Sequence, residues 1–167
     1  MSATNQYSQG TASDRRIRGT PETGNRMMDE LVQILRSGNH SLVVAGDGIR
    51  TFDGRGISDL YGLLTEHPDW LRGASVADKV VGKGAAALLV LGGVREVHAD
   101  VISIFALELL DSHSIKTTHK TIVPHIINRT GTGLCPLETR CMACKTSVEC
   151  LMQIKSFMEE MNTDKLR

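Results

Sequence analysis

Apolar residues at helical spacing predict a series of helices along the chain. RMMDELVQILRSGN places Met28, Leu31 and Leu35 on one face, and Gly38 ends the pattern. ISDLYGLLTEH and FALELLDSH repeat this spacing. In DKVVGKGAAALLVLGG, small and apolar residues fill nearly every position, which predicts a helix that starts near Asp78 and is buried almost all round.

Three other segments have strand patterns. SLVVAGDGIRTFDGRG has two short runs around an Asp-Gly pair, which predicts a hairpin. VREVHADVIS alternates with Val97, Ala99 and Val101 inward, and the β-branched IKTTHKTIVPHIIN carries a proline that favours a strand near a sheet edge. Strands separated by crossover helices predict an α/β fold, a three-layer α/β/α sandwich with a mixed sheet.

The chain length of 167 residues suits one domain. Residues 1–25 contain almost no large aliphatic side chains and predict a disordered polar tail. Three arginines in this tail, Arg15, Arg16 and Arg18, favour a solubilising role over a nucleic-acid arm. We therefore expect a single domain over residues 26–162 and a short tail over residues 163–167.

Composition limits the classes of partner. Lys and Arg together number 19, as do Asp and Glu, so no broad electrostatic attraction to nucleic acid is expected, and aromatic residues make up 4%. No stretch reaches the about 20 apolar residues of a membrane span, and the N-terminus lacks an apolar signal core. We expect a cytoplasmic protein with no nucleic-acid or membrane partner, in which a disulfide framework is the least expected use of cysteine.

The cysteines lie together in CPLETRCMACKTSVEC, and they are Cys135, Cys141, Cys144 and Cys150. The central C-x2-C pair is typical of zinc and iron–sulfur ligands, so a four-thiolate metal protein is one hypothesis. Against it, Thr146 to Glu149 predict a capping box that starts a final helix. Cys150 would then be a small core residue in the first turn of that helix.

Cys135 has a different setting, in NRTGTGLCPLE. Pro136 suits the first position of a helix, which makes Cys135 the cap and Glu138 the third residue inside. A thiol at a helix N-terminus is shifted toward thiolate, so Cys135 is a candidate reactive residue. Asn128 and Arg129, leaving a strand end beside glycines, could grip a phosphate or carboxylate. The alternative is a structural loop with an ion pair between Arg129 and Glu138.

The segment ADKVVGKG is similar to a phosphate loop but lacks its first glycine and its magnesium-binding hydroxyl. Asp78, Lys79 and Lys83, with Gly82 and Gly84 permitting close approach, could still hold an anion at a helix N-terminus. Equally, Asp78 could cap the helix while the lysines extend to water. The segment leaves both interpretations open.

Two segments of the chain resemble a zinc deaminase signature but lack several of its required residues. That signature needs His or Cys with Glu two residues on, then P-C-x-x-C at a helix start. The chain has Asp100 where the glutamate belongs, Arg140 where the proline belongs, and His98 in a predicted strand. We therefore expect neither deaminase chemistry nor a cofactor.

The segments DKVVGKGAAALLVLGGVREVHADVIS and VPHIINRTGTGLCPLE, with the hairpin, resemble a family of uncharacterised bacterial proteins with a cytidine deaminase-like fold. The resemblance covers about residues 28–155. It implies that the helices starting near Asp78 and after Ser103 replace the zinc-binding helices of deaminases without the zinc ligands. It further implies one cleft formed by Asp78, Lys79, Lys83, Ser103, Asn128, Arg129, Cys135 and Glu138. The last three cysteines depart from the family pattern.

These features favour binding of a nucleotide-like or phosphorylated small molecule in that cleft, with turnover left open. The candidate catalytic residues are Cys135 and Asp78. The candidate ligand-binding residues are Lys79, Gly82, Lys83, Ser103, Asn128, Arg129 and Glu138. Two alternatives remain: the four-cysteine zinc or iron–sulfur protein, and a non-catalytic structural or regulatory homo-oligomer whose apolar helix surface needs a partner.

Overall fold

The structure is a computed structural model that describes residues 21–128 and 130–165. Most of the predicted polar tail lies outside the described residues, as does Arg129. Helix α2 (Pro21–Ser37) begins inside the segment predicted as tail and ends just before Gly38. None of the described helices has the length and apolar character needed to cross a membrane.

Five strands form one mixed sheet in the order β2-β1-β3-β4-β5. Strand β1 is antiparallel to both β2 and β3, whereas β3, β4 and β5 run parallel. The strands are β1 (Leu42–Ala45), β2 (Ile49–Phe52), β3 (Ser75–Val81), β4 (Glu96–Ser103) and β5 (Lys116–Val123). The predicted α/β class, the hairpin of β1 and β2, and the edge position of β5 are confirmed.

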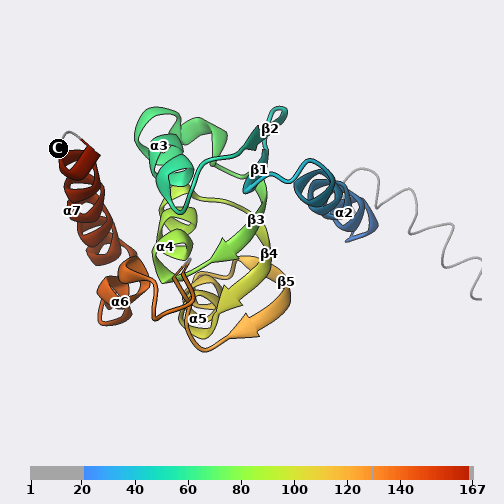
Figure 1. Cartoon of the computed structure of the whole chain (residues 1–167). Coiled ribbons are helices and arrows are strands. Elements are labelled where there is room, and N and C mark those ends of the chain that lie inside the picture. Colours follow the sequence, from blue (N-terminus) through green and yellow to red (C-terminus); the bar gives the residue numbers. More distant parts are fainter. Residues whose placement is uncertain (1–20, 129, 166–167) are drawn as a thin grey trace, which may run out of the picture.

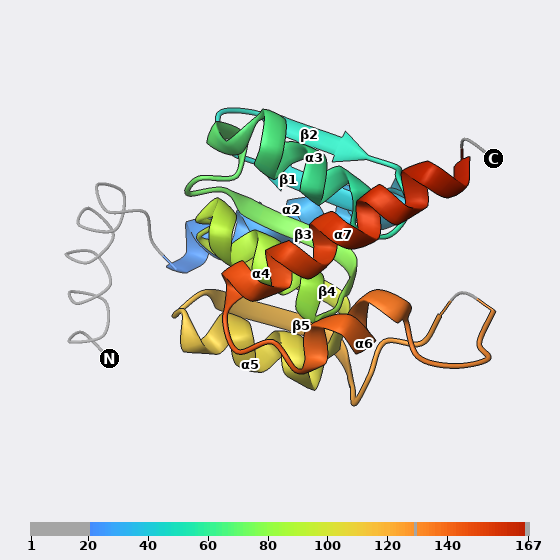
Figure 2. The same cartoon turned by 90° about the vertical axis from the view of Figure 1, so that its left-hand side faces the viewer.

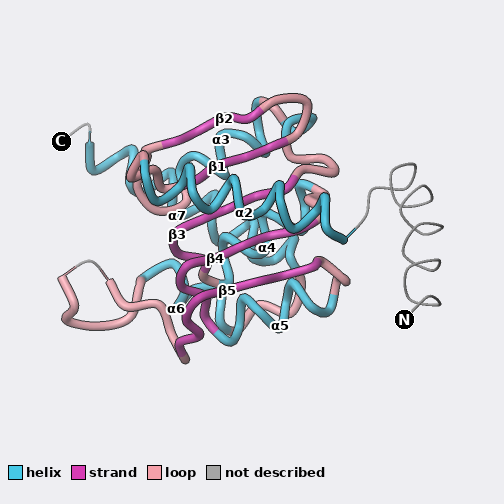
Figure 3. The backbone as a smooth tube through the Cα atoms, turned by 90° about the vertical axis from the view of Figure 1, so that its right-hand side faces the viewer, coloured by secondary structure: helices cyan, strands magenta, loops and turns pink. Residues whose placement is uncertain are grey.

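Helices cover the two faces of the sheet unequally. Helix α2 packs on β1 and β3 from one side (Figure 3). The other side carries α3 (Ser58–Glu66), the short 3-10 helix η1 (Pro68–Trp70), α4 (Lys83–Gly92) and α5 (Ile104–Ser112). Helices α6 (Pro136–Met142) and α7 (Ser147–Lys165) form an outer layer, in which α7 crosses over α4 (Figures 1 and 2).

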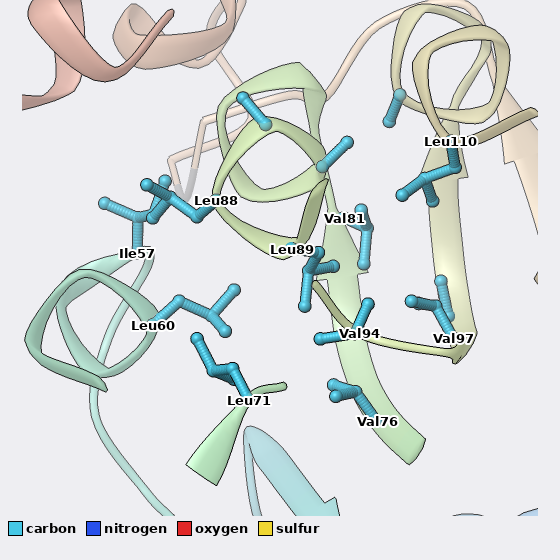
Figure 4. Close-up of a cluster of buried hydrophobic side chains, with 14 of the residues drawn as sticks. Ile57, Leu60, Leu71, Val76, Val81, Leu88, Leu89, Val94, Val97 and Leu110 are labelled. Atoms are coloured by element: carbon cyan, nitrogen blue, oxygen red, sulfur yellow. The ribbon is translucent and has the colours of Figure 1, made fainter. Parts of the chain in front are cut away.

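Helix α4 lies at the centre of the main core and is buried almost all round, as predicted. Leu88 and Leu89 are fully buried among side chains from α3, the sheet and α5, including Leu60, Val76 and Leu110 (Figure 4). Each large aliphatic side chain buried in this way contributes about 1.5–3 kcal/mol to stability. Because core side chains surround α4, their packing holds the N-terminal end of this helix in place.

The predicted start of that helix is wrong. Residues Ser75–Val81, read as loop and helix from the sequence, form β3, and α4 begins at Lys83. Strand β3 lies between β1 and β4 and pairs with both, so ladder hydrogen bonds outweigh the weak helical pattern. Asp78 is therefore a strand residue and caps no helix.

Two local predictions are confirmed with small changes. Val97 and Ala99 are buried, but beyond Asp100 the alternation shifts and Ile102 rather than Val101 enters the core. At α7 the Thr146 hydroxyl caps the helix as predicted, accepting from the amide of Glu149 at 3.1 Å, but the Glu149 carboxylate accepts from the amide of Lys145 at 2.7 Å rather than from that of Thr146.

Candidate functional site

The carboxyl ends of β3 and β4 bring two helix N-termini to one edge of the sheet. Gly82 is the N-cap of α4 and has no side chain to cap it. Ser103 is the N-cap of α5, and its hydroxyl accepts a hydrogen bond from the amide of Ala106 at 3.2 Å. Parallel strands followed at once by helices create this geometry, and it is where open α/β sheets bind ligands.

A buried carboxylate, that of Glu138, fills this position. Its Oε1 accepts hydrogen bonds from the amide of Lys83 at 3.0 Å and from Ser103 Oγ at 2.7 Å. Its Oε2 accepts from the amide of Ile126. Glu138 is only 2% exposed, so its charge depends on these donors and on the N-terminus of α4.

Helix α6 supplies the carboxylate. As predicted, Cys135 is its N-cap, Pro136 is its first residue and Glu138 is the third. A methyl group at Gly82 would lie 3.4 Å from Glu138 Oε1 and 3.2 Å from Ile126 Cγ1, so glycine permits this close approach. The structure therefore brings together four of the predicted site residues: Gly82, Lys83, Ser103 and Glu138.

Lys83 binds α6 a second time through its side chain. Its Nζ donates to the carbonyl oxygens of Met142 at 3.1 Å and Cys144 at 2.5 Å, near the C-terminal end of α6. An ammonium group is favoured there because the last carbonyls of a helix lack partners. Lys83 thus contacts both ends of α6, and in this conformation its ammonium group stabilises the C-terminal end of α6.

Other predicted residues lie apart from Glu138. Lys79 Nζ donates to Asn39 Oδ1 at 2.6 Å, beside the start of β1. Asp78 lies within β3, where burial raises its pKa to about 7 and its Oδ1 accepts from the amide of Val80 at 3.2 Å. Neither side chain contributes a contact to the carboxylate of Glu138.

The loop residue Asn128 is engaged locally. Its Oδ1 accepts from the amide of Thr132 at 3.0 Å and from Thr130 Oγ1 at 3.1 Å. These bonds hold the loop between β5 and α6 in shape. Arg129, predicted beside it, lies outside the described residues.

Cys135 is half-buried beside the Glu138 position, and its amide donates to the carbonyl of Ile126 at 2.8 Å. Its thiol makes no capping hydrogen bond to α6 within the described part of the chain. The reactivity of this thiol remains a prediction.

The other three cysteines come from α6, the connection after it and the first turn of α7, and they lie in or against the main core. Cys141 and Cys150 are fully buried and Cys144 is half-buried. Interaction with the Cys150 thiol lowers the pKa of Cys141, interaction with the Cys141 thiol raises that of Cys150, and burial raises the pKa of Cys144. The Cys144 thiol donates to the carbonyl oxygen of Arg140 at 3.7 Å. Among residues 21–128 and 130–165, no group of three or more His, Cys, Asp or Glu side chains has the arrangement of a metal site.

A hollow on the opposite face of the sheet was not predicted from the sequence. A cavity of about 330 Å³ lies between α2 and strands β4 and β5. Asp100 Oδ1 accepts from Arg36 Nη2 at 2.8 Å and lies 3.2 Å from His98 Nε2, while His98 Nδ1 lies 3.0 Å from Thr118 Oγ1. Burial alone would raise the pKa of Asp100, but these hydrogen bonds lower it. The pairing of His98 with Thr118 depends on strand register, which no local motif reveals.

Comparisons with known proteins show which family the sequence and fold of this chain match. A family model described as a domain of unknown function (DUF1893) matches residues 30–158. The chain is similar to a DUF1893 family protein from Thermotoga maritima whose crystal structure is known at 2.70 Å resolution, with a TM-score of 0.73 and 23% identity. That likeness covers 78% of this chain and 89% of the other. No curated protein matches significantly. The chain belongs to the DUF1893 family.

Proposed function

We propose that this protein binds a small phosphorylated, nucleotide-like molecule at the carboxyl ends of β3 and β4. The observation that carries the proposal is the convergence of three donors, from Lys83, Ser103 and Ile126, on the carboxylate of Glu138. Donors from three separate segments form a preorganised anion position. The sheet order and the helices that follow β3 and β4 are also compatible with the cytidine deaminase-like fold implied by sequence resemblance.

In this proposal, Glu138 occupies the anion position when no ligand is bound. A phosphate offers more acceptor oxygens and more charge than a carboxylate, so it can compete for the same donors. Release of Glu138 requires movement of α6, a helix of seven residues that follows a loop extending from the body of the protein (Figure 2). Cys135, at the start of α6, would then lie beside the ligand.

Competition between ligand and Glu138 gives a direct test. Calorimetry and thermal-shift measurements in phosphate-free buffer would use inorganic phosphate and a series of nucleoside monophosphates and dinucleotides. In Glu138→Gln the internal competitor loses its charge, so we expect about tenfold tighter binding, a change of about 1.4 kcal/mol. Glu149→Gln, which makes the same charge change at the exposed cap of α7, should bind as the wild type does. Absence of binding to both the wild type and Glu138→Gln would disprove the proposal.

A second candidate, a homo-oligomer, is favoured by strand β5. This strand lies at the edge of the sheet, and six of its eight residues are exposed. Parallel strands are ordinarily covered on both faces, and an open edge offers unpaired backbone groups to another strand. Light scattering after size exclusion would detect a dimer, which Ile122→Asp at the exposed strand end should dissociate. A monomer at about 100 µM, a concentration that favours even weak pairing, would exclude it.

A further inference from the structure

The hollow between α2 and strands β4 and β5 lies on the face of the sheet opposite α4 and α5. Helix α2 crosses β1 and β3 and leaves β5 clear on this side (Figure 3). The cavity measures about 330 Å³, which is within the range of about 300–1,000 Å³ typical of small-molecule sites. A ligand bound here would be distinct from the phosphorylated molecule proposed above.

Strand β4 gives the hollow a polar floor. Glu96 and His98 line the hollow, and they are only 5% and 9% exposed. The residues that follow each of them, Val97 and Ala99, enter the main core. A strand face beside a helix ordinarily carries apolar side chains, and departures from such patterns are expected at functional positions.

Hydrogen bonds hold this floor in place. His98 Nδ1 lies 3.0 Å from Thr118 Oγ1, and His98 Nε2 lies 3.2 Å from Asp100 Oδ1. Arg36 of α2 donates to the same carboxylate oxygen at 2.8 Å, which ties the helix to the strand. Thr118 is exposed, and because a hydroxyl can both donate and accept hydrogen bonds, it retains bonding capacity for a ligand.

The charges that line the hollow balance one another. They belong to two basic and two acidic side chains, which are Arg36, Lys116, Asp29 and Glu96. Arg36 forms an ion pair with Asp100 at 2.8 Å. Glu96 forms one with Arg95 at 3.3 Å. No described side chain forms an ion pair with Lys116 or Asp29, so one positive charge on β5 and one negative charge on α2 remain available.

We propose that this hollow binds a free α-amino acid with an apolar side chain. The carboxylate of the ligand pairs with Lys116 and accepts from the hydroxyl of Thr118, while its ammonium group pairs with Asp29. Met28 and Val32 also line the hollow and contact the apolar side chain. A simple anion would meet the acidic side chains and a simple cation the basic ones, so a molecule that carries both charges fits the lining best.

Calorimetry on the full chain at neutral pH tests the proposal with leucine, valine, methionine and phenylalanine as probes. We expect at least one of them to bind with a Kd below about 1 mM. The decarboxylated amine and the deaminated acid of that amino acid each lose one ionic contact, so both should bind at least about tenfold more weakly. No amino acid binding with a Kd below about 1 mM, or an amine or acid that binds as tightly as its amino acid, would overturn the proposal.

Variants locate the binding. Lys116→Met and Asp29→Asn remove one charge each at exposed positions and should weaken binding at least about tenfold. Lys120→Met on the same strand and Glu30→Gln on the same helix lie outside the lining and should bind as the wild type does. Unchanged affinity in either Lys116→Met or Asp29→Asn would contradict this site. If a variant does not fold, the comparison of analogues on the wild type still decides.

Discussion

Replacing Glu138 with alanine should destabilise the fold strongly. The change leaves three donors without their acceptor: the amides of Lys83 and Ile126 and the hydroxyl of Ser103. An unsatisfied buried donor costs about 1–3 kcal/mol, and bonds to a charged group lie at the upper end. Ser103 can rotate and Ile126 is only partly buried, so the sum falls to about 3–5 kcal/mol. That is a large fraction of the about 5–15 kcal/mol that stabilises a typical domain.

Urea denaturation can measure this loss. The single tryptophan, Trp70, stacks on His67 with ring centroids 4.1 Å apart, and its fluorescence can be followed together with far-ultraviolet circular dichroism. Glu159→Ala, an exposed change on α7, is the matched control and should shift stability by less than about 0.5 kcal/mol. Ser103→Ala should cost less in the Glu138→Ala background than in the wild type, because the two share a bond. A loss below about 1 kcal/mol for Glu138→Ala would refute the reasoning.

Three further predictions concern other positions. Because the pKa of Asp78 is raised from 3.8 to about 7, the folded chain retains a proton that the unfolded chain releases, so stability falls as pH rises from about 4 to 7. Asp78→Asn should gain stability relative to the wild type over that window in urea melts, and a constant difference would contradict this. At Gly92 an added Cβ would lie 2.9 Å from Leu71 Cβ, so Gly92→Ala should lower the free energy of unfolding by about 1–3 kcal/mol. An added Cβ at Gly62 on α3 meets open space, so Gly62→Ala should raise it by about 0.5–1 kcal/mol. A higher melting temperature for Gly92→Ala than for Gly62→Ala would contradict this account of the packing. Thr146→Ala should cost about 1 kcal/mol in urea, through loss of the α7 cap, and no change would argue against that cap.

The elements predicted best from the sequence are those whose signals lie within the segment itself, independent of the elements that pack against it. The hairpin has its Asp-Gly turn, α2 has its apolar stripe and glycine stop, and α7 has its capping threonine. Strand β3 was missed because Gly82 alone separates it from α4, so one apolar run contains two elements. Without a polar turn between them, only the ladders to β1 and β4 distinguish strand from helix.

The candidate site was partly predictable for a related reason. Glu138 was found because it lies at a helix start that the sequence marks clearly, whereas Ser103, the N-cap of α5, was named only through the family resemblance. The direction of the Lys83 side chain depends on where α6 ends, and the burial of Cys141 and Cys150 in one core depends on how α7 packs against α6. Such contacts arise from tertiary packing between segments, and a linear pattern carries little information about them.

The packing of α7 across α4 has a consequence for the order in which the chain can fold during synthesis. Cys150 and Ile154 of α7 are fully buried in the same core as Leu88 of α4, yet the ribosome makes α7 only after α5, β5 and α6. Until α7 emerges, the outer side of α4 stays uncovered, and the nascent sheet and its inner helices form an incomplete core that exposes apolar surface. Final consolidation must therefore wait for α7, and α4 is the surface that a chaperone would shield in the interval.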